Sequence, residues 1–359
     1  MNKRSLLILT IALGAIALLL SVLDAFSAKR KANWNLPEDR SLVSVDTLRN
    51  TRKIVILDND KPVVTLQSDD DNKWIVTEEH ALYVDHRRLN ELVKSLQDNS
   101  LDRFVTRDTE KIAKLNIGQK ELRFFDSDGK LLDSILFGKN GKKGGIFIQR
   151  EGDDVVYLSA FADALDNDPS RWIEKKLIYV GAEDLAKIEA HWTGESEDTL
   201  TVTQENAEAD FELSPARDGY ELNTGKVEST LHAIFNLRFN KASLKSELPD
   251  YEEAMKSAIT FSFQLLKDEG DFTVAFARSS KVVEQENDKG EMESKTVNGL
   301  VYMTLTSNTS HVALPKNADQ LVFVIPDYSF NSIPKSSAEW LMVKPTPEQP
   351  ATEDPVPTE

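Results

Sequence analysis

Two stretches of the chain, 82–105 and 219–243, carry apolar residues at the three- and four-residue spacing of an amphipathic helix. A residue suited to capping a helix N-terminus precedes each apolar face, Asp85 in the first stretch and Asn223 in the second. The two faces consist of Leu89, Leu92, Val93 and Leu96, and of Val227, Leu231 and Ile234. The pattern therefore predicts one main helix in each half of the chain.

Strict alternation of apolar and polar residues surrounds two turn signals. Residues 121–138 alternate into and out of an Asp128-Gly129 turn, and residues 259–277 do the same around Glu269-Gly270. Each hairpin follows a short stretch that opens with acidic residues, 108–110 and 250–252, where the N-terminal dipole of a short helix favours negative charge. We predict a short helix and then a hairpin in both halves.

The predicted elements occur twice in the same order. Each half reads as three short strands, a helix, a strand, a short helix, about four strands and a closing turn that contains Trp. The second copy carries insertions in two polar segments, 279–299 and 304–320, and we expect the first of them to be a solvated hairpin loop. The expected fold class is α+β: two tandem repeats of mostly antiparallel sheet, 45–180 and 181–343.

The closing segments of the two halves are "DNDPSRW", which ends at Trp172, and "IPKSSAEW", which ends at Trp340. Both tryptophans are candidates for partner contact. The favoured interpretation is that each closes a core after the last strand, because a Trp side chain buries a large apolar area.

The N-terminal segment has the length of a membrane span. No charged residue occurs from 5 to 23, and roughly 18 to 20 apolar residues are enough to cross a bilayer as a helix. We predict a cytoplasmic tail (1–4), a transmembrane anchor (5–26) and a linker (27–44), with the body outside the cytoplasm. The alternative is a cleaved signal peptide with its cleavage site at Ala25-Phe26-Ser27. Basic residues flank both ends of the span, so the positive-inside rule leaves the orientation open.

Composition excludes several classes of function. The formal net charge of -17 argues against a nucleic-acid partner, because phosphate binding needs clustered Lys and Arg. The absence of cysteine excludes thiol catalysis, thiolate zinc sites and disulfides. The C-terminal segment, 344–359, is rich in Pro and Glu and is predicted to be a disordered tail.

The glycine- and lysine-rich segment "GKNGKKGG", 138–145, superficially resembles a phosphate-binding loop. It has no Gly-Lys-Ser/Thr and lies between two predicted strands, whereas a P-loop opens a helix. We interpret it as a basic hairpin loop. Its three lysines, Lys139, Lys142 and Lys143, are candidates for contact with an anionic headgroup or a protein partner.

Other chemistry is poorly supported. "DSDGK" (126–130) suggests a calcium loop, but its twelfth position is Phe137 where an acidic ligand is required. The five histidines show no metal-ligand spacing, and no Gly-x-Ser-x-Gly motif occurs; they are His80, His86, His191, His232 and His311. The sequence thus predicts no catalytic residue, no metal site and no cofactor.

Several of these segments together resemble the domain of unknown function family DUF4340. They are Lys73-Trp74-Ile75, the Asp85-capped helix, the "DSDGKLLDSILFG" hairpin, "GGIFIQREGDDVVYL" and the N-terminal span. The resemblance covers most of 45–180 and, more loosely, 181–342. A Gly common in the family between the short helix and the hairpin is replaced here by the run 114–117.

The resemblance implies a bacterial, membrane-anchored protein associated with ABC transporters of the gliding-motility auxiliary type. The expected location is the bacterial inner membrane, with a single span and a periplasmic body. The expected partners are membrane or ATPase-associated subunits of the transporter. The family supplies no catalytic residue.

The resulting expectation is a non-enzymatic, membrane-anchored envelope protein that acts as an interaction platform or accessory subunit of an ABC-type transport system. The alternative is an envelope receptor that binds a ligand in a cleft between the two repeats. A hydrolase that uses His80 or His86 is the third interpretation.

Overall fold

The computed structural model describes residues 36–162, 165–193, 197–286 and 292–344. The chain divides into two compact units, Met1–Ile173 and Glu174–Glu359, whereas the sequence placed the boundary after residue 180. The predicted anchor (5–26) lies outside the described residues, as does the C-terminal tail from residue 345 onward. Within the described part of the chain, no helix is both long enough and apolar enough to span a membrane.

Unit 1 is built on a nine-stranded antiparallel sheet with the order β4-β3-β2-β1-β6-β7-β8-β9-β5. Its strands are β1 (Lys53–Asp58), β2 (Lys61–Ser68), β3 (Trp74–Val76), β4 (Leu82–Tyr83), β5 (Arg103–Thr106), β6 (Lys120–Phe125), β7 (Leu131–Asn140), β8 (Ile146–Arg150) and β9 (Val156–Ser159). Its helical segments are α2 (Val45–Asn50), α3 (His86–Asp98), α4 (Thr109–Ala113) and the 3-10 turn η1 (Pro169–Arg171).

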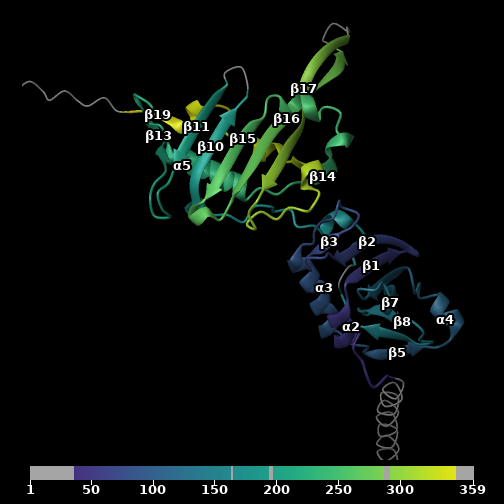
Figure 1. Ribbon diagram of the computed structural model, residues 1–359. Coiled ribbons are helices and arrows are strands. Elements are labelled where there is room, and N and C mark those ends of the chain that lie inside the picture. Colours follow the sequence, from purple (N-terminus) through teal and green to yellow (C-terminus); the bar gives the residue numbers. More distant parts are fainter. Residues whose placement is uncertain (1–35, 163–164, 194–196, 287–291, 345–359) are drawn as a thin grey trace, which may run out of the picture. The chain divides into compact units, whose positions relative to one another are not determined.

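The main helix of unit 1, α3, lies against one face of the sheet (Figure 1). The Asp85 side chain accepts hydrogen bonds from the backbone N–H groups of Arg87 and Arg88, so the predicted N-cap is confirmed. The apolar stripe is buried at Leu89, Leu92 and Leu96. The helix is therefore fixed at its start by the cap and along its length by apolar packing.

Unit 2 is built on an eight-stranded antiparallel sheet with the order β12-β11-β10-β15-β16-β17-β18-β14 and a separate pair, β13-β19. Its strands are β10 (Leu185–Trp192), β11 (Asp198–Thr203), β12 (Glu212–Leu213), β13 (Tyr220–Leu222), β14 (Lys241–Leu244), β15 (Ile259–Leu265), β16 (Asp271–Glu286), β17 (Met292–Ser307), β18 (Leu321–Ile325) and β19 (Leu341–Val343). Its helices are α5 (Thr224–Phe235), α6 (Tyr251–Met255) and α7 (Asp327–Asn331), and its 3-10 turns are η2 (Ala182–Asp184), η3 (Lys245–Glu247), η4 (Leu266–Asp268), η5 (Ala318–Gln320) and η6 (Ser337–Trp340).

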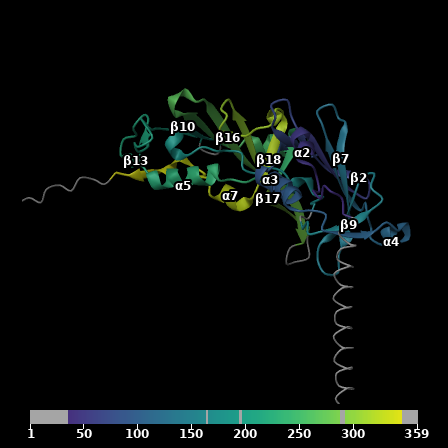
Figure 2. The same cartoon turned by 90° about the horizontal axis from the view of Figure 1, so that it is seen from below.

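Helices α5 and α7 lie along the same side of the unit 2 sheet (Figure 2). Asn223 caps α5 by accepting a hydrogen bond from the backbone N–H of Lys226, as the sequence predicted. The predicted apolar face is buried at Val227, Leu231 and Ile234. Unit 2 is thus mostly sheet, with one longer helix, as unit 1 is.

The two sheets share one order of strands. When β10, β11 and β12 are matched with β1, β2 and β3, and β14 to β18 with β5 to β9, the two orders coincide, apart from the additional edge strand β4. The predicted composition of mostly antiparallel sheet with few helices is confirmed. A shared order of strands can arise without duplication.

The prediction of a loop at 279–299 is wrong for the described residues of this segment. Strands β16 and β17 continue as a paired ribbon, from Ser280 opposite Asn298 to Glu286 opposite Met292. The segment reads as polar because both faces of a two-stranded ribbon are exposed to water, so the alternation that marks a half-buried strand is lost. In Figure 1 this ribbon extends beyond the neighbouring strands of unit 2.

The run 114–117, which replaces the Gly common in the family, contains a left-handed residue. Asn116 has a φ of 54°, and Gly118 follows with a φ of 87°. Asn is one of the few residues other than Gly that tolerate this region. The turn between α4 and β6 is therefore retained without a glycine in that run.

Candidate functional site

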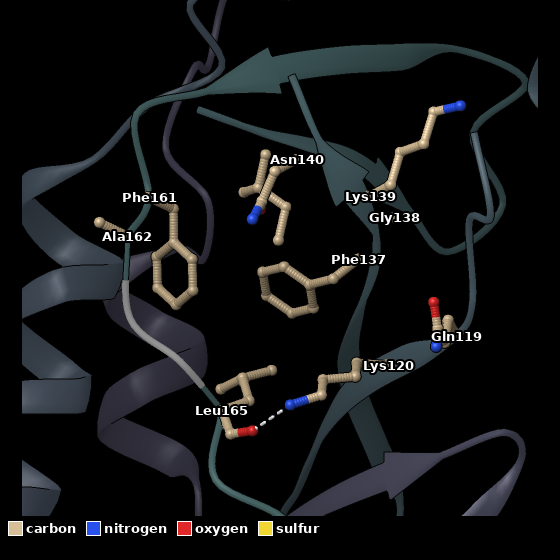
Figure 3. Close-up of a pocket in the computed structure, with 10 residues that line it drawn as sticks. Gln119, Lys120, Phe137, Gly138, Lys139, Asn140, Phe161, Ala162 and Leu165 are labelled. Atoms are coloured by element: carbon tan, nitrogen blue, oxygen red, sulfur yellow. Dashed lines mark hydrogen bonds between the residues drawn. The ribbon is translucent and has the colours of Figure 1, made fainter. Parts of the chain in front are cut away.

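A pocket of about 470 Å³ opens in unit 1 beside the ends of β6 and β7 (Figure 3). Small-ligand sites commonly occupy about 300–1,000 Å³, so its size suits a small molecule. The pocket is lined by Gln119, Lys120, Phe137, Gly138, Lys139, Asn140, Ile146, Phe161, Ala162 and Leu165. Of these residues, the sequence predicted only Lys139 as a contact candidate.

The interior of the pocket is aromatic and aliphatic. Phe137 from β7 and Phe161, which follows β9, face each other with ring centroids 5.2 Å apart (Figure 3). Both rings and the Leu165 side chain are almost completely shielded from water. Distant segments bring these residues together, which explains why no local signal marked the pocket.

Two lysines stand at the rim of the pocket. The Lys120 ammonium donates a hydrogen bond of 2.5 Å to the Leu165 carbonyl, and the Lys139 ammonium donates one of 2.5 Å to the Lys114 carbonyl. An ammonium group has three donors, so each of these bonds leaves donors for other acceptors. The ten described residues that line the pocket include these two lysines and no Asp or Glu.

Gly138 lets a neighbouring segment approach β7. A Cβ atom at this position would lie 2.6 Å from the Leu115 carbonyl oxygen and 2.7 Å from Cδ1 of Ile117. Any larger residue would push the 115–117 segment away from the strand. Gly138 thus helps to hold in place the strand that carries Phe137 and Lys139.

The basic loop predicted at 138–145 is confirmed as a hairpin connection. Strand β7 ends at Asn140, and β8 begins opposite it at Ile146. Lys139, Lys142 and Lys143 are all exposed. The first of these lines the pocket, whereas the other two lie in the connecting loop.

The ribbon of unit 2, residues 280–286 and 292–298, is a second candidate surface. Val282 is 70% exposed and Met292 is 66% exposed, and both lie on the same ribbon face because Met292 pairs with Glu286, four residues beyond Val282. Strand β16 pairs with β15 only as far as Phe276, and β17 pairs with β18 only from Val301 onward. In the described structure the ribbon strands therefore pair only with each other.

The base of the ribbon is anchored by a bulge and by a buried phenol. The register between β16 and β17 shifts between Arg278 and Ser280, and Ser279 at this bulge packs against Gly299. The Tyr302 hydroxyl donates a hydrogen bond of 2.6 Å to the Asp250 carboxylate. Burial and this carboxylate together raise the pKa of Tyr302 to about 12.

Helix α7 also packs at the ribbon base through Phe330. The Arg278 guanidinium lies 4.9 Å from the centre of the Phe330 ring and donates a 3.0 Å hydrogen bond to Asp327. The Lys335 ammonium lies 3.6 Å from the centre of the same ring. These contacts fix α7 beside the point at which the ribbon leaves the sheet.

Trp172 and Trp340 are buried, with 1% and 0% of their surfaces exposed. Both therefore belong to the cores of their units, which was the favoured interpretation. Neither side chain is available for contact with a partner.

The acidic turns perform structural roles. The Asp126 carboxylate accepts hydrogen bonds from the backbone N–H groups of Asp128 and Lys130, which is the geometry of a hairpin turn. The Asp166 carboxylate forms ion pairs with Arg88 and Arg171. Within the described ranges, no group of three or more His, Asp or Glu residues is arranged to hold a metal ion.

The histidines whose contacts are described each have a different partner. His80 occupies a turn with a φ of 54°, and His86 opens α3. His191 contacts Thr199 at 2.9 Å, and His311 contacts Glu269 at 3.2 Å. These contacts do not assemble a Ser-His-Asp arrangement among the described residues.

Comparison with known proteins places the chain in a family without assigning an activity. The family model described as "Domain of unknown function (DUF4340)" matches residues 74–254. No curated protein matches the chain, and no solved structure matches it. The matched range covers half of the chain and includes parts of both units, and on this basis the chain belongs to the DUF4340 family.

Proposed function

We propose that this protein is a non-enzymatic, membrane-anchored envelope protein that serves as an interaction platform or accessory subunit of an ABC-type transport system. The N-terminal apolar segment, 5–26, would hold it in the inner membrane with both units in the periplasm. The transporter partner is suggested by the family resemblance. The partners would be its membrane or ATPase-associated subunits.

The observation that carries the proposal is the ribbon of unit 2. Large apolar side chains at Val282 and Met292 are exposed on one face of a paired segment that extends past its sheet. Exposed apolar surface of this kind marks contact sites when it is grouped. Free strand edges also offer backbone groups to an incoming strand. Both properties favour a protein partner.

We further propose that the two units are copies of one repeat. The shared strand order supports this, as does a matching backbone hydrogen bond at each closing Trp. Two copies of a scaffold allow one copy to acquire an insertion while the other retains the original connection. The ribbon would be such an insertion, because unit 1 joins β7 and β8 by a short loop in its place.

Co-purification in mild detergent tests the transporter proposal. The double variant Val282→Glu with Met292→Glu places two charges on the apolar ribbon face. We expect the recovery of the transporter's membrane and ATPase subunits to fall at least tenfold relative to the unchanged chain. The amounts are measured by quantitative mass spectrometry.

A matched variant controls for charge. Gln285→Glu with Lys295→Gln changes the net charge by the same amount on the opposite ribbon face, and its recovery should stay within about twofold of the unchanged chain. Equal loss in both variants would point to a general charge effect. The proposal fails if the unchanged chain recovers no transporter subunit above a version with a scrambled segment 5–26.

A further inference from the structure

We propose that an acidic pocket in unit 2 binds an aliphatic diamine. The pocket has a volume of about 290 Å³ and lies where η2, the segment after β11 and the start of α5 meet. It is lined by Ala182, Glu183, Gln204, Ala207, Glu208, Ala209, Asp210, Phe211, Thr224 and Glu228. The pocket is separate from the ribbon, and its ligand does not depend on the transporter role proposed above.

Four carboxylates line this acidic pocket, and its ten described lining residues include no Lys or Arg. The four residues are exposed, and they are Glu183, Glu208, Asp210 and Glu228. None of them forms an ion pair in the described part of the chain. Like charges around one concave surface raise the local concentration of ions of the opposite charge. The charge of the pocket therefore favours a cationic ligand.

Gln204 is buried at the pocket and has no partner for its side-chain amide. Its backbone N–H donates to the Ala186 carbonyl, so pairing with β10 continues for one residue beyond β11. The alternation that buries Leu200 and Val202 therefore points the Gln204 side chain to the same face of the sheet, on which α5 lies (Figure 2). Thr224 and Glu228 of α5 line the pocket together with it.

The burial of this amide is the observation that points to a ligand. Only 6% of Gln204 is exposed, and its side chain makes no hydrogen bond to the described residues. A buried amide without a partner costs free energy, because it has lost hydrogen bonds to water. An ammonium group in the pocket could donate to the amide oxygen and restore one of them.

Apolar side chains supply most of the remaining lining. They are Ala182, Ala207, Ala209 and Phe211, of which Phe211 is 8% exposed. Methylene groups placed against this surface would leave water without losing hydrogen bonds, and this stabilises the bound state. A hydrated inorganic cation would gain nothing from it. The lining therefore favours an organic cation with a hydrocarbon chain.

The separation of the carboxylates distinguishes a diamine from a metal ion. They belong to three segments: η2, residues 204–211 and α5. A calcium ion needs six or more oxygen ligands at roughly 2.3–2.6 Å. Within the described ranges, no group of three or more His, Asp or Glu residues is arranged to hold a metal ion. Two ammonium groups joined by a short chain can instead be held by separate carboxylates.

Isothermal titration calorimetry of the full chain in detergent tests this inference. The probe is 1,4-diaminobutane, and the comparison is 1-aminobutane, which has the same chain but one ammonium group. We expect the monoamine to bind roughly tenfold more weakly, because it loses one charge-assisted contact. Binding of the diamine should also weaken as the ionic strength rises from about 0.01 M to about 0.15 M, because the screening length falls from about 30 Å to about 8 Å.

Two variants and a matched control locate the binding. Glu228→Gln should weaken diamine binding roughly tenfold, whereas Glu252→Gln, which removes an exposed carboxylate from α6, should leave it unchanged. Gln204→Leu replaces the amide with an apolar side chain of similar size. It should weaken diamine binding while the melting temperature of the ligand-free chain stays the same or rises, because an unpartnered buried amide does not stabilise the fold.

Thermal unfolding shows that each variant remains folded and gives a second measure of binding. The diamine should raise the melting temperature of the unchanged chain and of Glu252→Gln, and raise that of Glu228→Gln less. If Gln204→Leu unfolds unit 2, the two Glu variants, both at exposed positions, decide the matter.

Three results would overturn the inference. They are no binding of 1,4-diaminobutane, equally tight binding of 1-aminobutane, and equal weakening by Glu228→Gln and Glu252→Gln. Displacement of the diamine by calcium chloride at equal concentration would indicate a metal site and would overturn it as well.

Discussion

In unit 1 the Trp172 carbonyl accepts a hydrogen bond of 2.7 Å from the N–H of Asp85, and in unit 2 the Trp340 carbonyl accepts one of 2.8 Å from Asn223. In both units the closing Trp is thus joined by its backbone to the N-cap of the main helix. The side chains that surround the two indole rings differ. The connection that closes each unit is shared, whereas the packing beneath it is not.

The indole of Trp172 is covered by a charged side chain. The Arg88 guanidinium lies 4.5 Å from the centre of its ring and forms an ion pair with Asp166. The indole N–H donates a 2.9 Å hydrogen bond to the Asp166 carbonyl. The first unit therefore closes with a charged layer, Arg88 and Asp166, over the buried ring.

The indole of Trp340 lies within an aromatic cluster. Its ring meets Trp192 edge to face at 6.0 Å and lies 5.7 Å from Phe261. The indole N–H is satisfied by the Thr230 hydroxyl at 3.1 Å. The second unit thus closes within an aromatic core.

A second difference concerns the acidic residue before the short helix. The Asp108 carboxylate caps α4 by accepting hydrogen bonds from the N–H groups of Glu110 and Lys111. The Asp250 carboxylate makes no capping bond to α6 and accepts a hydrogen bond from Tyr302 instead. The same residue type therefore stabilises a helix in unit 1 and a strand of the ribbon in unit 2.

The largest expected effect is at the closing tryptophans. Trp340→Ala should lower the free energy of unfolding of unit 2 by about 3–5 kcal/mol, because it empties a site packed against two other rings. Trp172→Ala should cost about 3 kcal/mol, at the lower end of this range, because Arg88 can collapse into the space. Hydrogen exchange of peptides from each unit measures the two losses separately.

The exposed Tyr328 provides the control for these substitutions. Its side chain is 74% exposed, so Tyr328→Ala should change the stability of unit 2 by less than about 0.5 kcal/mol. Equal losses for Trp172→Ala and Trp340→Ala would show that the difference in packing has no energetic consequence.

The next effect concerns the phenol at the ribbon base. Tyr302→Phe removes a hydrogen bond to a carboxylate and should cost unit 2 about 1.5–3 kcal/mol at neutral pH. Because the folded-state pKa is raised from 10.0 to about 12, this contribution is fully present below pH 10 and is lost as the pH rises towards 12. Denaturant unfolding across this range measures it.

The Asp250 carboxylate of the same pair contributes stability with the opposite pH dependence. The hydrogen bond from Tyr302 lowers the pKa of Asp250 below its ordinary value of 3.8. The contribution of this carboxylate is therefore present above pH 3.8 and is lost as the pH falls through the lower folded-state pKa. A difference between Tyr302→Phe and the unchanged chain that stayed constant from acid to alkaline pH would contradict this account.

The smallest expected loss of stability concerns two glycines, Gly299 within β17 and Gly145 directly before β8. A Cβ at Gly299 would clash with the Ser279 hydroxyl, so Gly299→Ala should cost about 1–3 kcal/mol, and adding Ser279→Ala should recover part of it. Gly145 has a φ of 76°, and a Cβ there would meet the Ser159 carbonyl at 2.5 Å. Gly145→Ala should therefore not be rescued by Ser159→Ala. Thermal unfolding of the single and double variants tests both expectations.

Local signals predicted most elements correctly. The caps at Asp85 and Asn223 and the Asp128-Gly129 turn depend on residues within a few positions of each other, so the sequence carries their full signal. The strands of the ribbon were missed because neither face is buried, and alternation in the sequence reports burial rather than strand pairing. The helix α2 was also missed, since it presents no buried apolar face.

The candidate pocket was predicted only at its edge. Lys139 lies in a glycine- and lysine-rich loop that is conspicuous in the sequence, whereas Phe161 and Leu165 resemble ordinary core residues. Lys139, Phe161 and Leu165 line one pocket because strands β6 to β9 pair in register. This pairing brings together residues that are about 25 positions apart in the sequence. The spacing of these residues along the sequence does not show that they line one cavity.

The sequence by itself determined the kind and order of the elements, the hairpin turns, the helix caps and the membership in a family, because these depend on neighbouring residues or on overall similarity. Only the tertiary structure decided that Asp250 binds Tyr302 and that Phe137 faces Phe161. Strand pairing sets these contacts, and pairing is a property of the whole sheet, in which one register satisfies all backbone hydrogen bonds together.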